Sequence, residues 1–198
     1  MKKTIWMPLV LGVTLGALSF FSSAVGFFIH YGVAGAVGPH EIFMVLSAAL
    51  GGPWGLFVAS IIHIAGAHIF LMHAPPELAT PALLNSVGDF IARAIALLAV
   101  AYCYKYLYQR AQKAMSFFAG WILIVGIYYA LLLPLQALDW AITLPGYLSL
   151  STIVQNAPPE ILTVVIITSL IWFALPVRYR RPLWYESKKA PDQNGEIK

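Results

Sequence analysis

The sequence predicts an all-α, polytopic integral membrane protein with about six transmembrane helices. Of its 198 residues, 60% are hydrophobic and 10% are charged, whereas soluble domains carry about 25% charged residues. Eleven of the 12 Lys and Arg residues fall in three clusters between long apolar stretches: Lys2 and Lys3, Lys105 to Lys113, and Arg178 to Lys198. Such clusters mark the cytoplasmic side, so we expect an inner (cytoplasmic) membrane protein with both termini cytoplasmic.

The basic clusters also account for the net charge of +4. We assign this charge to topology and to contact with anionic lipid, and not to nucleic-acid binding. Residues 1–177 are expected to form one transmembrane domain. Residues 178–198 are expected to form a basic juxtamembrane segment that ends in a disordered cytoplasmic tail.

The first predicted span covers residues 5–28, because the chain is uncharged from Thr4 to His40 and roughly 20 apolar residues cross a bilayer. Within this span, Gly12 and Gly16 have the GxxxG spacing that lets another helix approach closely.

A cleaved signal peptide is the alternative for this segment, since two lysines precede an apolar core and Ser22-Ser23-Ala24. We expect the segment to be retained, because the apolar run continues to Ile29.

The second and third predicted spans, about 37–51 and 54–73, are short and are joined by a turn at Gly52, Pro53 and Gly55. Glycine and proline break helices. An even number of crossings must separate the first two basic clusters if both are on the same side. This stretch must therefore cross twice, or dip into the membrane and return, with its turn on the cytoplasmic side.

The last three predicted spans are about 82–104, 115–137 and 157–176, each near the length that a helix needs to cross. Pro75-Pro76 and Pro158-Pro159 lie at the outer starts of the first and last of these three spans. Proline suits a helix start, because its missing amide would have no intrahelical acceptor there.

One polar group inside a predicted span requires an explanation. Asn85, Asp89 and Arg93 are spaced four apart, so they share one helical face, and the acid-before-base order favours an Asp89–Arg93 ion pair. An ionisable residue in a span is by default a functional-site hypothesis. The alternatives are a ligand site and an internal pair that locks the bundle, and both stay open.

The histidines invite a metal site, but their spacing argues against one. His63, His68 and His73 are five apart, whereas neighbouring ligands on a helix need a spacing of three or four. We expect no metal and no cofactor. His63 shares a face with small residues, which favours helix packing and an interhelical hydrogen bond.

Other polar residues map to outer helix ends. We expect them to form a wet interfacial belt or to roof a ligand pocket. The candidate ligand-binding residues are His40, Glu41, Asn85, Asp89, Asp139, Trp140, Asn156 and Glu160. No nucleophile elbow, phosphate loop or hydrolase signature is present in the sequence, so we do not expect an enzyme.

The segment from Gly38 to Ile171 resembles the transmembrane receptor region of LytS-type sensor histidine kinases. The matching features are the apolar run before Gly52-Pro53-Trp54-Gly55, the order of the spans, Leu133-Pro134 to Trp140, and Ile153-Val154 followed by Pro159. Such kinases carry signalling and kinase domains after this region. This chain ends 22 residues after Pro176, so we expect no kinase activity.

The resemblance implies a small membrane module that binds a small molecule or senses the state of the envelope, and that acts through a kinase or regulator. Substrate-binding S components of ECF-type vitamin transporters have a similar turn and helix layout. They are the alternative, with a transporter coupling subunit as partner, docked through small-residue faces such as Gly12 and Gly16.

Overall fold

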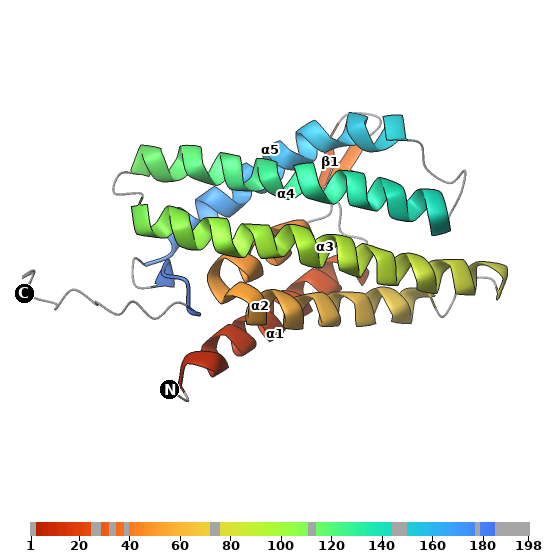
Figure 1. Cartoon of the computed structure of the whole chain (residues 1–198), viewed down its shortest axis with the longest axis horizontal. Coiled ribbons are helices and arrows are strands. Elements are labelled where there is room, and N and C mark those ends of the chain that lie inside the picture. The colour runs from red at the N-terminus through yellow and green to blue at the C-terminus, as the bar shows by residue number, and fades with distance from the viewer. Residues whose placement is uncertain are drawn as a thin grey trace, which may run out of the picture.

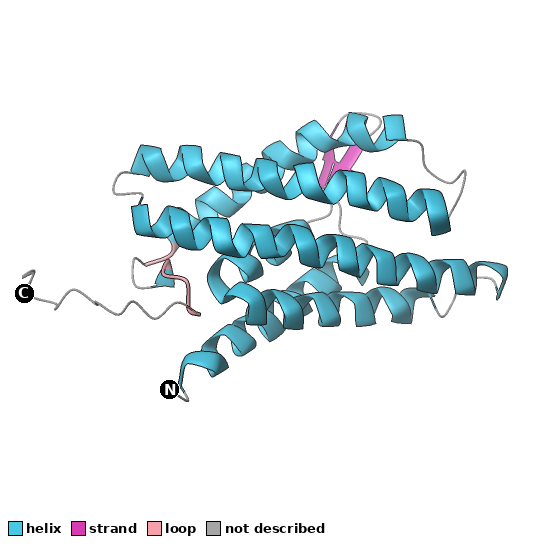
Figure 2. Cartoon of the chain, in the orientation of Figure 1, coloured by secondary structure: helices cyan, strands magenta, loops and turns pink. Residues whose placement is uncertain are grey.

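The computed structural model describes residues 3–24, 29–31, 35–37, 40–71, 76–110, 114–143, 150–176 and 179–184. The described residues form five helices: α1 (Lys3–Ala24), α2 (His40–Leu71), α3 (Pro76–Arg110), α4 (Ala114–Thr143) and α5 (Leu150–Ala174). Two short antiparallel strands, β1 (Ile29–Tyr31) and β2 (Gly35–Val37), follow α1 and precede α2 in the chain, and β2 contacts α5 (Figure 2).

The fold is a helical membrane bundle. Four helical stretches, in α2, α3, α4 and α5, are long and apolar enough to cross a membrane, and α1 contributes a shorter apolar stretch from Trp6 to Ser22. The second and third predicted spans correspond to the two halves of α2, which are two helical segments joined across a kink at Gly52. The expected count of about six membrane helices stays a prediction, because four stretches meet the length and hydropathy needed to cross.

Helix α2 breaks at Gly52, whose φ of 61° and ψ of −152° are not helical. A positive φ is readily adopted only by glycine. A Cβ at this position would also overlap the indole ring of Trp184. Both the backbone and the packing therefore require glycine at this turn.

The contacts of α1 show that α2 reverses direction at this break. Pro8 lies against Gly51, and Ser19 donates a hydrogen bond to the carbonyl of His40 at 3.4 Å. The first half of α2, residues 40–51, is therefore antiparallel to α1.

The second half of α2, residues 53–71, runs parallel to α1. A Cβ on Gly12 would come within 2.6 Å of the Gly55 carbonyl oxygen, and one on Gly16 within 2.8 Å of the Ala59 Cα. The small-residue spacing thus serves the contact of α1 with α2 inside the chain. The expectation that this face docks on a coupling subunit is wrong, because α2 covers it.

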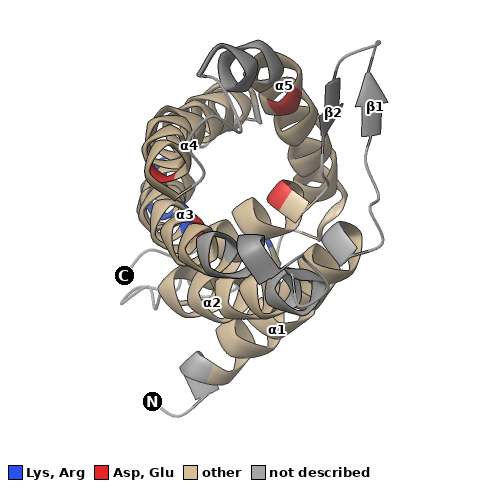
Figure 3. Cartoon of the chain, turned by 90° about the vertical axis from the view of Figure 1, so that its right-hand side faces the viewer, with Lys and Arg blue, Asp and Glu red and all other residues tan. Residues whose placement is uncertain are grey.

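Helices α2 to α5 are arranged around a common centre, and α1 packs outside them on α2 (Figure 3). Of the most apolar window of α2, 72% is buried, against 33% for each of α3, α4 and α5. Helix α2 is therefore shielded by protein, while the other three expose a broad face to lipid.

Both described ends of the chain and the turn of α2 lie at one end of the bundle, on the left in Figure 1. The C-terminal strap, defined as residues 179–184, crosses the turn there. The Leu183 amide donates to the Leu50 carbonyl at 2.8 Å, and the Tyr104 hydroxyl donates to the Arg180 carbonyl at 2.6 Å. We call this the basic end, because Lys105, Arg110 and Arg180 lie there.

An aromatic layer fills the half of the bundle nearer the basic end. The rings of Phe117 and Trp172 stack with centroids 3.5 Å apart, and Tyr104 meets Trp121 edge-on at 5.6 Å. The Trp121 indole donates to the Thr168 hydroxyl at 2.8 Å. These residues come from α3, α4 and α5, so the layer joins these three helices through large apolar contacts.

Candidate functional site

A charged cluster lies at the middle of the bundle. Arg93 is 17 residues from each end of α3 (76 to 93, and 93 to 110), and Tyr128 is near the centre of α4. Arg93 is only 7% exposed. An unpartnered charge at this depth costs about 2.5–3.5 kcal/mol or more, so its partners define the site.

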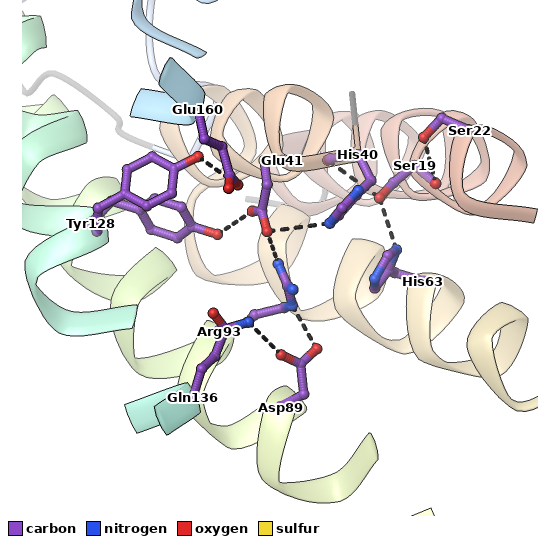
Figure 4. Close-up of polar contacts among 11 residues, drawn as sticks. Ser19, Ser22, His40, Glu41, His63, Asp89, Arg93, Tyr128, Gln136 and Glu160 are labelled. Carbon is purple, nitrogen blue, oxygen red and sulfur yellow. Dashed lines mark hydrogen bonds and ion pairs between the residues drawn. The ribbon is translucent and has the colours of Figure 1, made fainter. Parts of the chain in front are cut away.

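Arg93 binds two carboxylates from different helices (Figure 4). Its Nε donates to Asp89 Oδ2 at 2.6 Å, across one turn of α3. Its Nη1 donates to Glu41 Oε1, at the start of α2. The guanidinium thereby ties the first turn of α2 to the middle of α3.

The other carboxylate oxygens also have donors. The Tyr128 hydroxyl donates to Glu41 Oε2, and the Gln136 amide donates to Asp89 Oδ1 at 2.7 Å. Both donors come from α4, so three helices close the network. We call Glu41, Asp89, Arg93, Tyr128 and Gln136 the central cluster.

The start of α2 explains why an acid can sit at this depth. Glu41 is in the first turn of α2, where the helix dipole favours a negative charge. The first half of α2 has 12 residues, which corresponds to about 18 Å. It therefore runs from the middle of the bundle to the basic end. Half-helix starts at mid-membrane depth are typical of binding sites in transport proteins.

Two histidines and a serine extend the central cluster toward α1. His40 Nε2 lies 3.3 Å from Glu41 Oε1, and its ring stacks on that of His63 with centroids 5.2 Å apart. A 3.0 Å hydrogen bond joins Nδ1 of His63 to Ser19 Oγ of α1. His63 thus makes an interhelical hydrogen bond to α1.

Glu160 of α5 lies beside the cluster on the opposite side (Figure 4). One of its oxygens accepts from the Tyr129 hydroxyl at 3.1 Å. Tyr128 and Tyr129 are neighbours in sequence and bind different acids, so α4 supplies one hydroxyl donor to Glu41 and one to Glu160.

A second polar group lies further from the basic end. The Asn85 amide donates to Asp139 Oδ2 at 2.7 Å and to the Thr143 hydroxyl at 3.3 Å. Asp139 packs so closely on Gly88 that a Cβ there would overlap its carboxylate. This group joins α3 to α4 near the end of α4.

The structure divides the predicted ligand-binding residues between these groups. The expectation that Glu41 lies exposed at an outer helix start is wrong, because it is 2% exposed and lies beside Arg93 at mid-depth. Asn85 pairs with Asp139 and not with Asp89. Trp140 is half-buried and has interactions of its own. The side chains of Asn156 and His68, and the whole of His73, lie outside the described residues.

The residues that complete the network were not among the predicted site residues. Tyr128, Tyr129 and Gln136 lie in a strongly apolar span. Their polar atoms were the available signal, because a polar side chain in a span needs a partner. The cross-helix contact between Arg93 and Glu41 had no signal in local spacing, because the two residues are 52 positions apart.

Carboxylates outnumber cations in this region. Arg93 is the only Lys or Arg between Lys3 and Lys105, and it already contacts two acids, while Glu160 and Asp139 add two more nearby. Among the described residues, no group of three or more His, Cys, Asp or Glu has an arrangement that could hold a metal ion. The site is suited to binding a group that donates hydrogen bonds or carries positive charge.

Comparison of this chain with family models, with curated proteins and with solved structures finds no match.

Proposed function

We propose that the protein is a membrane module that binds a small molecule at the central cluster and passes its occupancy to a protein partner. The observation that carries this proposal is the buried network of Glu41, Arg93 and Asp89 at mid-depth. Buried charges are weak contributors to stability, and ionisable residues inside a membrane are usually functional.

The charge balance indicates the class of ligand. Glu160 has one hydrogen-bond donor, the Tyr129 hydroxyl, among the described contacts, and the acids exceed Arg93 in number. A protonated amine offers three donors and a positive charge. We therefore propose a zwitterionic or amine-bearing compound of modest size, whose amine binds between Glu41 and Glu160.

The first half of α2 offers a route from this site to the basic end. It starts at Glu41 and ends at Leu50, whose carbonyl accepts the hydrogen bond from Leu183 of the strap. Nearly every residue between them is buried. A ligand that moves Glu41 would shift this short helix as a unit. The shift would move the Leu50 carbonyl, to which the strap is hydrogen-bonded.

The proposed membrane topology follows from the same helices. The bundle contains six helical segments if each half of α2 is counted separately. The first half of α2 spans only part of the depth. The basic end faces the cytoplasm under the positive-inside rule. Both termini and the strap then lie where a cytoplasmic partner can reach them.

A ligand screen by thermal shift tests the proposal on purified protein. The panel contains amine-bearing, neutral and anionic small molecules, and each is tested on the wild type, Glu41→Gln and Thr168→Val. Thr168→Val is the matched control, because it also alters a buried polar residue but lies in the aromatic layer. We expect an amine-bearing compound whose affinity falls about tenfold or more in Glu41→Gln, since a charge-assisted hydrogen bond is lost. A ligand that is untouched by Glu41→Gln but lost on substitution near Lys105 would contradict this site.

The transporter-subunit alternative predicts a different partner. The Gly12 and Gly16 face is covered by α2, so a coupling subunit would have to use another surface. Purification of the tagged protein from its native membrane separates the two functions. Co-purification of ATPases would favour transport, and co-purification of a kinase or regulator would favour sensing.

A further inference from the structure

A groove of about 440 Å³ lies at the basic end, away from the central cluster. Its walls come from three segments: the first turns of α1, including Trp6 and Val10; the end of the first half of α2, at Leu50; and the chain after α5, including Tyr179 and Leu183. Its lining is almost entirely apolar. Its volume lies within the range of about 300–1,000 Å³ that is typical of small-molecule sites.

We propose that this groove binds an acyl chain of an anionic phospholipid. Its walls are open to the bilayer, because Trp6 and Val10 are 69% and 61% exposed and lie on the lipid-facing side of an apolar helix. The surrounding solvent at that depth is lipid, so a hydrocarbon chain is the chemistry that fits the lining.

The charge at the basic end selects the headgroup. Arg180 and Arg181 lie in the strap between two groove-lining residues, Tyr179 and Leu183. Lys2 directly precedes α1 in the sequence, and Lys3 is the first residue of α1. No acid occurs from Lys105 to Arg110 or from Arg178 to Trp184. Basic juxtamembrane residues attract anionic lipid.

The C-terminal residues 186–198 are poorly suited to fill the groove in place of a lipid chain. Residues 186–198 read Glu-Ser-Lys-Lys-Ala-Pro-Asp-Gln-Asn-Gly-Glu-Ile-Lys, with Ile197 as the only large apolar residue. Burying such a segment against an apolar lining would desolvate its charges without partners.

Lipid in the groove would also hold the strap in place. Leu50 and Leu183 line the groove, and the hydrogen bond from the Leu183 amide to the Leu50 carbonyl joins the strap to the end of α2. An acyl chain that packs on both side chains protects this bond from water. Anionic lipid is thereby expected to favour the docked strap, whether or not a ligand occupies the central cluster.

The test compares phosphatidylglycerol with phosphatidylcholine on the full-length protein. Native mass spectrometry counts the lipid molecules retained by the wild type, Val10→Trp and Leu123→Trp. Val10→Trp fills the groove. Leu123→Trp places the same bulk on an exposed face of α4 outside it. We expect phosphatidylglycerol to be retained about fivefold better than phosphatidylcholine, the factor for one basic residue at an anionic surface. Val10→Trp should abolish this preference, and Leu123→Trp should keep it.

Hydrogen exchange supplies a second readout that does not depend on the variants. The Leu183 amide should exchange several-fold more slowly in phosphatidylglycerol nanodiscs than in phosphatidylcholine nanodiscs. Equal retention of the two lipids would overturn the proposal, as would equal loss in both Trp variants. A dimer that Val10→Trp dissociates would show that a second copy of the chain fills the groove, and this would also overturn it.

Discussion

The central cluster and the aromatic layer bury polar atoms in opposite ways. In the aromatic layer, the polar atoms of Trp121 and Thr168 are neutral and bind each other, and rings supply most of the contact. In the central cluster, one guanidinium holds two carboxylates from different helices. Among the described residues, rings and a hydrogen bond between neutral groups join α3, α4 and α5 in the aromatic layer. This contrast motivates the proposal that the charges of the central cluster do more than hold helices together.

Removal of Arg93 should have the largest effect. Arg93→Met leaves the buried Glu41 and the partly buried Asp89 without their guanidinium partner. Breaking a buried ion pair in this way costs about 3–5 kcal/mol. The loss is measured as the free energy of unfolding in detergent. Arg110→Met is the control, because Arg110 is exposed at the basic end, and it should change stability little. A small loss in Arg93→Met would mean that the acids are already neutral or are served by other donors.

Removal of one acid should cost less than removal of the cation. Glu41→Gln leaves Arg93 paired with Asp89 and keeps an oxygen to accept from the Tyr128 hydroxyl. We expect a loss of about 1.5–3 kcal/mol, the value of one hydrogen bond to a charged group. The same unfolding assay applies, and a loss equal to that of Arg93→Met would show that the two acids do not share the guanidinium.

The smallest effect should come from the aromatic layer. Thr168→Val removes the acceptor of the Trp121 indole. Interhelical hydrogen bonds in membrane proteins contribute about 0.6 kcal/mol on average and at most about 1.7. Trp121→Phe, which removes the donor instead, should lose more than Thr168→Val, because it also leaves a cavity where the buried indole packs. If Thr168→Val loses as much unfolding free energy as Arg93→Met, the neutral pair of the aromatic layer and the ion pairs of the central cluster contribute equally to stability. The contrast between the two regions would then be wrong.

The sequence predicted the features that depend on local pattern. The helical membrane class followed from composition. The break in α2 followed from Gly52 and Pro53, because the backbone preferences of glycine and proline act locally. The Asp89–Arg93 pair followed from a spacing of four. The depth of Glu41 did not follow, because it depends on the packing of α2 against other helices, as in the contact with Arg93, which is 52 positions away. The contacts of Arg93 with Glu41, and of Asn85 with Asp139, join residues more than 50 positions apart and depend on how the helices pack.

We propose that the charges of the central cluster serve a ligand and not the fold. The direct test is the unfolding free energy of the triple variant Glu41→Gln, Asp89→Asn, Arg93→Met, which removes all three charges but keeps groups that can bind Tyr128 and Gln136. Replacing a buried ion network by neutral residues of similar size is often neutral or stabilising. We predict that the triple variant unfolds within about 1 kcal/mol of the wild type and loses the response to the amine-bearing ligand. A loss of stability as large as that of Arg93→Met alone would contradict the claim and make the cluster a structural lock.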